Sequence, residues 1–265
     1  MIREFFGFGG YTREAEGFLS WQHIAFVSAL MAIMVISAVI LGRKNKIRDE
    51  KAKNRVLIAA ALIMDGVELL RIILLCVFGG NPMAFLYNLP LFMCSIQMIT
   101  LPLAAFSKGR IREAAMDFVC IFGIFGAVLG TYGAGNNYGS YPVICFDNVI
   151  SGITHASAGF ASLYIMITGM ARMKRKNIVC TFAIIISFCI AAYIANILLD
   201  YNYMFLMRGD GTPYDILYNL VSGHKVIYPA IVLGLFLVYI LIFYAIWHCI
   251  RRRKEKKLCS PIHQN

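Results

Sequence analysis

Residues 23–41 read HIAFVSALMAIMVISAVIL, and residues 42–55, GRKNKIRDEKAKNR, follow them directly. The first stretch holds no charged residue and is long enough to cross the hydrocarbon core of a bilayer, which takes about 20 apolar residues in a helix. The second stretch is strongly basic, as the cytoplasmic end of a membrane span commonly is. This pairing of an apolar run with a basic loop recurs along the chain and predicts an integral membrane protein.

The composition of the whole chain supports this prediction. Of its 265 residues, 60% are hydrophobic and 15% are charged, and the mean hydropathy is +0.70. A soluble domain has roughly 45–50% apolar and about 25% charged residues. The composition therefore excludes a soluble enzyme and a nucleic-acid-binding domain. The formal net charge of +11 lies mostly in the basic loops, where it attracts anionic lipid and not nucleic acid.

The predicted fold class is all-α, a bundle of seven transmembrane helices. Unbroken apolar runs of this length exclude a β-barrel, whose strands alternate in units of about 10 residues. The predicted spans are His23–Leu41, Val56–Phe78, Tyr87–Phe106, Ala114–Ala134, Val149–Met170, Ile178–Leu199 and Val226–Ile250.

The basic residues give the predicted orientation in the membrane. Most of the 25 Lys and Arg residues fall after the first, third, fifth and seventh spans, which is the same side of a seven-span chain. The positive-inside rule places this side in the cytoplasm and the N-terminus outside. The chain is thus expected to comprise an extracellular segment (1–22), a membrane domain (23–250) and a basic cytoplasmic tail (251–265), in the plasma membrane.

Ionisable residues within the spans are candidates for function, because an Asp or Arg at the centre of a membrane helix costs about 2.5–3.5 kcal/mol on insertion scales. The second span holds Asp65, Glu68 and Arg71 at intervals of three residues. This spacing keeps them on one helix face, so Glu68 can meet Arg71 or Asp65. The pattern fits an internal ion pair that fixes the span against its neighbours, and it fits a site for a proton or a substrate headgroup.

The third and fifth spans both enter from the predicted outer side, and Cys94 and His155 lie at similar depths in them. A Cys thiol attacks an ester carbonyl as the thiolate, so it needs a base, and a neutral imidazole in the same layer can take its proton. We therefore expect Cys94 to be the nucleophile and His155 the base of an acyl transfer in an outward-facing cavity. Glu68, Asn196 or Asn202 is expected to orient the imidazole or to donate to the oxyanion.

A set of motifs extends from the first span to the last. They are Ser20-Trp-Gln-His23, Glu68, Leu89-Pro-Leu-Phe-Met-Cys-Ser95, His155, Asn196 and Asn202-Tyr-Met-Phe-Leu206. Together they resemble the YwaF-like family of bacterial membrane proteins, which is similar to eukaryotic transmembrane acyltransferases that remodel phospholipids through a cysteine nucleophile. The resemblance implies that Cys94 is the nucleophile. Members often have His where Phe92 stands, which leaves His155 or His23 as the base.

The leading hypothesis is a membrane-embedded acyltransferase that acts on a membrane phospholipid or related acyl lipid and uses neither a cofactor nor a metal. One alternative is a zinc-dependent seven-span lipid hydrolase with His23, His155 and His224 and either Asp200 or Glu68 as ligands. No helix carries a His-x-x-x-His pair, which makes this the weaker enzyme hypothesis.

A second alternative is a transporter or receptor for a small polar ligand or a lipid headgroup. In that case Asp65, Glu68, Arg71 and Asn196 would line the binding site. Replacement of Cys94 distinguishes the two classes, because it abolishes acyl transfer and leaves binding or transport intact.

Overall fold

The computed structural model of the chain describes residues 2–8 and 10–259. All regular secondary structure in these residues is helical, so the predicted all-α fold class is confirmed. The chain forms two compact units, Met1–Ala171 and Arg172–Asn265. The predicted division by membrane topology, with boundaries after residues 22 and 250, remains a prediction.

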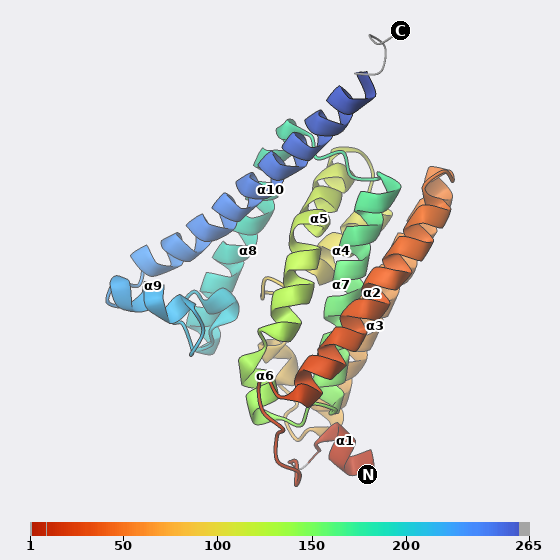
Figure 1. Ribbon diagram of the computed structural model, residues 1–265. Coiled ribbons are helices and arrows are strands. Elements are labelled where there is room, and N and C mark those ends of the chain that lie inside the picture. Colours follow the sequence, from red (N-terminus) through yellow and green to blue (C-terminus); the bar gives the residue numbers. More distant parts are fainter. Residues whose placement is uncertain (1, 9, 260–265) are drawn as a thin grey trace. The chain divides into compact units, whose positions relative to one another are not determined.

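The first unit contains the regions of the first five predicted spans, coloured from red to green in Figure 1. Its helices are α1 Ile2–Phe6, α2 Trp21–Asn45, α3 Glu50–Phe78, the 3-10 helix η1 Ala84–Tyr87, α4 Gln97–Phe106, α5 Gly109–Tyr132, α6 Gly135–Ser140 and α7 Phe146–Thr168.

Local side-chain chemistry sets several helix ends in this unit. Ser20 caps α2 by accepting a hydrogen bond from the backbone N–H of His23 at 3.2 Å. Asp49 caps α3 in the same way, with Ala52 as donor at 3.1 Å. Such caps satisfy N–H groups that have no partner within the helix. Helix α7 ends at Gly169, whose φ of 72° suits a residue without a side chain.

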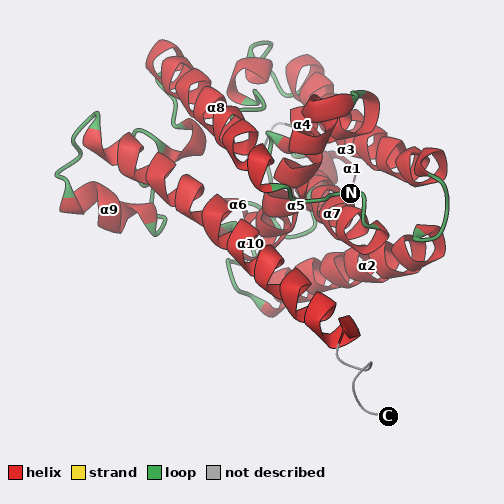
Figure 2. Ribbon diagram, turned by 90° about the horizontal axis from the view of Figure 1, so that it is seen from above, coloured by secondary structure: helices red, strands yellow, loops and turns green. Residues whose placement is uncertain are grey.

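Helix α7 is central to the first unit, because it packs against α2, α3 and α5 (Figures 1 and 2). Small residues allow α5 and α7 to approach closely. A methyl group at Gly123 of α5 would lie 2.6 Å from the carbonyl oxygen of Ala158 in α7. Ser162 of α7 donates a hydrogen bond to the carbonyl of Cys120 at 2.7 Å. Close backbone packing and such hydrogen bonds hold membrane helices together where lipid supplies no hydrophobic driving force.

The second unit contains η2 Arg175–Asn177, α8 Ile178–Leu199, η3 Tyr203–Phe205, α9 Tyr214–Leu220 and α10 Ile227–Cys259. Helices α8 and α10 pack together, and the hydroxyls of Thr181 and Tyr244 lie 3.3 Å apart at this contact. Helix α10 continues into the predicted cytoplasmic tail as far as Cys259, and residues 260–265 lie outside the described residues.

Five helices of the described chain are long and apolar enough to cross a membrane. They cover Trp21–Asn45, Gly109–Ser140, Phe146–Thr168, Arg175–Leu199 and Ile227–Arg253. The chain is thus a multi-pass membrane protein. Helix α3 has 29 residues, the length of a span, but Asp65, Glu68 and Arg71 interrupt its apolar sequence.

The prediction of a continuous helix over Tyr87–Phe106 is wrong. Helix α4 begins at Gln97 and has 10 residues, and Leu89–Ile96 is not helical, with turns over its last four residues. Pro90 contributes to this difference, because the residue before a proline is pushed out of the helical region of backbone conformation. Cys94 consequently lies in a turn directly before α4 and not inside a helix.

We predict that Gly123→Ala destabilises the protein by about 1–3 kcal/mol, because the new methyl group must push against a backbone carbonyl of α7. Gly66→Ala in α3 is the matched control, since no atom outside its own helix lies within 4 Å of a methyl group there. Unfolding of the two variants in mixed detergent, followed by circular dichroism, measures the difference. Equal stability of the two variants would contradict close α5–α7 packing at this point.

Candidate functional site

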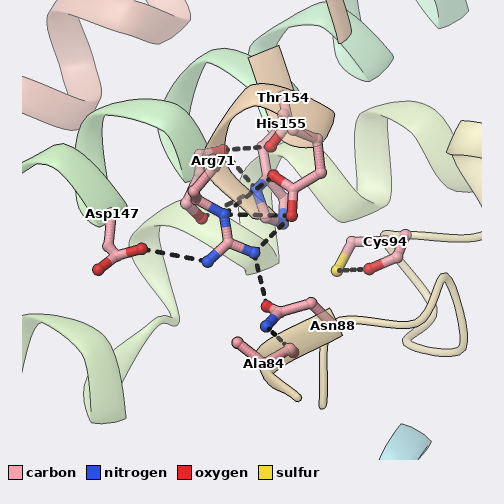
Figure 3. Close-up of polar contacts among 10 residues, drawn as sticks. Arg71, Ala84, Asn88, Cys94, Asp147, Thr154 and His155 are labelled. Carbon is pink, nitrogen blue, oxygen red and sulfur yellow. Dashed lines mark hydrogen bonds and ion pairs between the residues drawn. The ribbon is translucent and has the colours of Figure 1, made fainter. Parts of the chain in front are cut away.

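Arg71 is at the centre of a polar network in the first unit (Figure 3). Its Nε donates to both carboxylate oxygens of Glu68, at 3.2 and 3.3 Å. Its Nη1 donates to Asp147 Oδ1 at 3.1 Å, and its Nη2 donates to Asn88 Oδ1 at 2.7 Å. The side chains of Arg71 and Glu68 are only 16% and 13% exposed. The predicted contact between Glu68 and Arg71 is therefore confirmed.

The network connects three segments of the chain. Glu68 and Arg71 are on α3, Asp147 is in the first turn of α7, and Asn88 directly follows η1. Asn88 also donates to the Ala84 carbonyl at 2.8 Å, which ties its side chain to η1. Because a buried charge is tolerated only when it is paired and hydrogen-bonded, these contacts hold the start of α7 and the turn before α4 against α3. With two carboxylates and one guanidinium, the network is negative overall.

His155 lies on the same face of α7 as Asp147, two turns further along, with Ser151 between them. Its Nδ1 is 2.7 Å from the backbone oxygen of Ser151. A carbonyl oxygen only accepts hydrogen bonds, so Nδ1 carries the proton and Nε2 retains its lone pair. Among the residues that the structure describes, no group forms a hydrogen bond with His155 Nε2, which is buried. The ring is thus held in the tautomer that can accept a proton at Nε2.

Cys94 is next to this imidazole. The thiol and the ring are close enough to act on each other electrostatically. Helix α5 gives independent evidence of their proximity: a methyl group at Gly130 would overlap the imidazole, and one at Gly126 would lie 3.7 Å from Cys94 Cβ. Residues four apart in a helix are separated by about 6 Å along its axis. Cys94 and His155 therefore contact consecutive turns of one α5 face.

The Arg71 network and the Cys94–His155 pair form one site. The Glu68 carboxylate acts electrostatically on His155, although no hydrogen bond joins them in the described structure. Figure 3 shows Cys94 beside the network. The Cys94 sulfur lies 4.0 Å from Ser95 Oγ. The site thus combines the thiol of a half-buried cysteine, an imidazole with a free lone pair and a fixed negative charge.

His23, which the sequence offered as a second base or substrate-orienting residue, lies elsewhere in the first unit. Its Nδ1 accepts from the backbone N–H of Leu19 at 3.1 Å, and its Nε2 is 3.1 Å from the carbonyl oxygen of Thr131. Its ring stacks on Tyr138 with a centroid separation of 3.9 Å. Because both ring nitrogens are engaged, His23 connects the start of α2 to the end of α5 and leaves His155 as the histidine beside the thiol.

Asn196 and Asn202 belong to the second unit, where they hold the chain after α8. Asn196 Nδ2 donates to the Tyr203 carbonyl at 3.1 Å and its Oδ1 accepts from the Tyr203 N–H at 2.6 Å. Asn202 donates to Asp210 Oδ2 at 2.7 Å. From the sequence we expected one of these amides, or Glu68, at the second nitrogen of His155. The structure places the backbone carbonyl of Ser151 there instead.

The predicted site did not include Asp147, and it gave no role to Gln97, which lies near Cys94 in the sequence. Asp147 is the second acidic partner of Arg71, and its spacing of eight residues from His155 is the signal that places both on one face of α7. Gln97 follows Cys94 by three residues at the start of α4. Its Oε1 accepts from Thr100 at 3.1 Å, while its Nε2 is a buried donor without a partner in the described part of the chain.

The zinc hypothesis requires His23, His155 and His224 to surround one metal ion together with Asp200 or Glu68. Within residues 2–8 and 10–259, no group of three or more His, Cys, Asp or Glu side chains is arranged to hold a metal ion. His224 lies in the second unit, where its Nδ1 faces the backbone N–H groups of Val226 and Ile227 at 3.3 Å each.

The chain matches the model of a known protein family. The model of the TMEM164 family, a transmembrane protein family, matches residues 18–247. Because the match covers most of the chain and includes every residue of the site, the chain belongs to the TMEM164 family. No curated protein and no solved structure matches the chain.

The geometry predicts that Cys94 is unusually reactive. His155→Ala and Gly130→Ala should each slow alkylation of Cys94 by N-ethylmaleimide at neutral pH by at least about tenfold, since the thiolate forms less readily without the imidazole in place. Peptide mass spectrometry of the detergent-purified protein measures the rate at each cysteine.

Gly126→Ala is the matched control, because a methyl group there makes only an ordinary contact of 3.7 Å with Cys94. Its alkylation rate should stay within about twofold of the wild-type rate. An unchanged Cys94 rate in His155→Ala would show that the imidazole does not activate the thiol.

Proposed function

We propose that this member of the TMEM164 family is a membrane-embedded acyltransferase that carries an acyl chain as a thioester on Cys94, with His155 as general base. The proposal rests on the hydrogen bonding of the two ring nitrogens of His155. Its Nδ1–H donates a hydrogen bond to the Ser151 carbonyl. Its Nε2, which has no hydrogen-bond partner among the described residues, lies beside the thiol. The family match supports a transmembrane protein, and the proposed reaction rests on the site.

In the first half-reaction, His155 Nε2 takes the thiol proton of Cys94. The thiolate then attacks the carbonyl carbon of an acyl ester, and a C–S bond forms. Collapse of the tetrahedral intermediate breaks the ester C–O bond. The imidazolium returns its proton to the departing alcohol oxygen, which leaves an acyl thioester on Cys94.

The second half-reaction reverses these roles with a different alcohol. His155 Nε2 takes the proton of the acceptor hydroxyl, whose oxygen attacks the thioester carbonyl. The C–S bond breaks, the new ester departs, and the thiolate recovers a proton from the imidazolium. No cofactor is consumed, because an ester is exchanged for an ester.

Other residues of the site have positioning and electrostatic roles. The Glu68 carboxylate acts on His155, so it partly balances the positive charge that the imidazole carries during each half-reaction. Arg71 fixes Glu68 in place. Gln97 Nε2, buried and without a partner among the described residues, is the donor that we assign to the developing oxyanion.

The substrate of this reaction is a membrane phospholipid or a related acyl lipid. A multi-pass chain whose site lies among apolar helices receives a substrate from the bilayer more readily than one from water. The proposal keeps the seven-crossing topology, in the plasma membrane with the N-terminus outside, which the distribution of Lys and Arg favours. The proposal places the site in a cavity that opens toward the outer side of the membrane.

Replacement of the two reacting residues tests the proposal. Cys94→Ala should abolish transfer of a labelled acyl chain from phosphatidylcholine to a lysophospholipid in reconstituted vesicles, because the thioester cannot form. His155→Ala should lower the rate about 10²–10⁴-fold, the usual contribution of a general base. Thin-layer chromatography of the labelled lipids gives both rates.

Cys76→Ala is the control for the loss of a cysteine, since Cys76 is also partly exposed and lies outside the site. It should retain the wild-type rate. If Cys94→Ala transfers acyl chains as the wild type does, Cys94 is not the nucleophile and the proposed mechanism is wrong. If the wild type shows no transfer while binding a polar ligand in a Cys94-independent way, the chain is a transporter or receptor and the acyltransferase proposal is wrong.

A further inference from the structure

A cavity lies within the second unit, between the start of α8 and the second half of α10, and has a volume of about 330 Å³. One end is lined by Arg175, His248 and Arg252. The other end is lined mainly by apolar side chains, among them Leu241 and Ala245. None of these residues belongs to the Cys94 site, so the cavity is a separate feature of the fold.

The charged end of the cavity lacks an anionic partner. In the described part of the chain, neither Arg175 nor Arg252 forms an ion pair, whereas the neighbouring Arg251 is paired with Glu255 at 3.0 Å. His248 Nε2 is buried and has no hydrogen-bond partner among the same residues. The positive charges of Arg175, Arg251 and Arg252 act together on the His248 ring. Converging cationic donors of this kind suit a phosphate group.

The apolar end indicates that the anion belongs to a lipid. Tyr244, only 2% exposed, lies at the α8–α10 contact beside the cavity. From Leu241 toward the start of α10, exposed apolar residues continue with Val238 and Leu235, which are 51% and 45% exposed. In a membrane helix such a face is in contact with acyl chains. The charged end therefore opens onto a surface that already packs against lipid.

We propose that this cavity is a binding site for one anionic phospholipid, whose phosphate contacts Arg175, His248 and Arg252 and whose acyl chain lies along Leu241 and Ala245. In the topology proposed above, this end of the helices faces the cytoplasm, where anionic lipids give the leaflet its negative surface potential. The site does not depend on the acyl-transfer reaction, and lipid bound there is not the substrate of Cys94.

Native mass spectrometry of the full-length protein, released from nanodiscs of phosphatidylglycerol and phosphatidylcholine, tests this proposal. The wild type should retain one phosphatidylglycerol in preference to phosphatidylcholine. The double variant Arg175→Gln/Arg252→Gln should retain about tenfold less phosphatidylglycerol, since it lacks both charges that neutralise the phosphate.

The matched control is Lys176→Gln/Arg253→Gln, which removes two exposed positive charges at adjacent positions that do not line the cavity. It should retain phosphatidylglycerol within about threefold of the wild type, the loss expected from general surface charge alone. Equal losses in the two double variants would show that the basic end of the helices attracts lipid without a specific site, and would overturn the proposal.

A third variant tests the apolar end without a change in charge. Ala245→Phe fills the cavity and should also displace the retained phosphatidylglycerol; full retention in this variant would contradict the assigned position of the acyl chain. Inorganic phosphate, added alone, should leave the bound phosphatidylglycerol in place. Displacement of the lipid by inorganic phosphate would assign the cavity to soluble phosphates and overturn the lipid assignment.

Discussion

A guanidinium group within the hydrocarbon core of a membrane must be neutralised by protein partners, because acyl chains offer none. Arg71 meets this requirement with Glu68 on its own helix, Asp147 at the start of α7 and Asn88 before α4. The three partners come from separate segments, so neutralising one charge fixes three parts of the first unit relative to one another. The position of the turn that holds Cys94 and the position of the α7 face that holds His155 both depend on this network.

A backbone carbonyl and a glycine also help to position the reacting side chains of the site. The Ser151 carbonyl selects the tautomer of His155, and Gly130 leaves the space that the imidazole occupies. Neither contribution involves a chemically reactive side chain. A thiol in a turn and an imidazole on a long helix would rarely meet without such constraints, since a shift of about 1 Å is enough to impair a catalytic contact.

The sequence predicts the parts of this molecule that depend on hydropathy and on spacing within one helix. The apolar runs predict the helices, and the three-residue interval between Glu68 and Arg71 predicts their contact. The depths of Cys94 and His155, estimated by counting residues from the outer side, bring them into one layer. All of these inferences use only the geometry of a regular helix in a bilayer of known thickness.

The parts that escape prediction depend on contacts between segments. The non-helical stretch Leu89–Ile96 replaces a helix where Pro90 and the Arg71–Asn88 hydrogen bond both act. Every residue has a backbone carbonyl, so a hydrogen bond to one leaves no signal in the sequence. The sequence therefore predicts a side chain as the partner of His155 Nδ1. Asn196 was expected at this ring because its depth was suitable, but its amide hydrogen bonds are made to Tyr203 within the second unit.

The central claim is that Cys94 carries the acyl chain. Its most direct test is intact-mass and peptide mass spectrometry of the purified protein after brief incubation with a phospholipid of defined acyl chains. The account predicts an added mass equal to one acyl group, located on the peptide that contains Cys94 and removed by neutral hydroxylamine, and greater accumulation when no acceptor is present. An acyl adduct on another residue, or no adduct under conditions in which acyl transfer proceeds, would contradict the account.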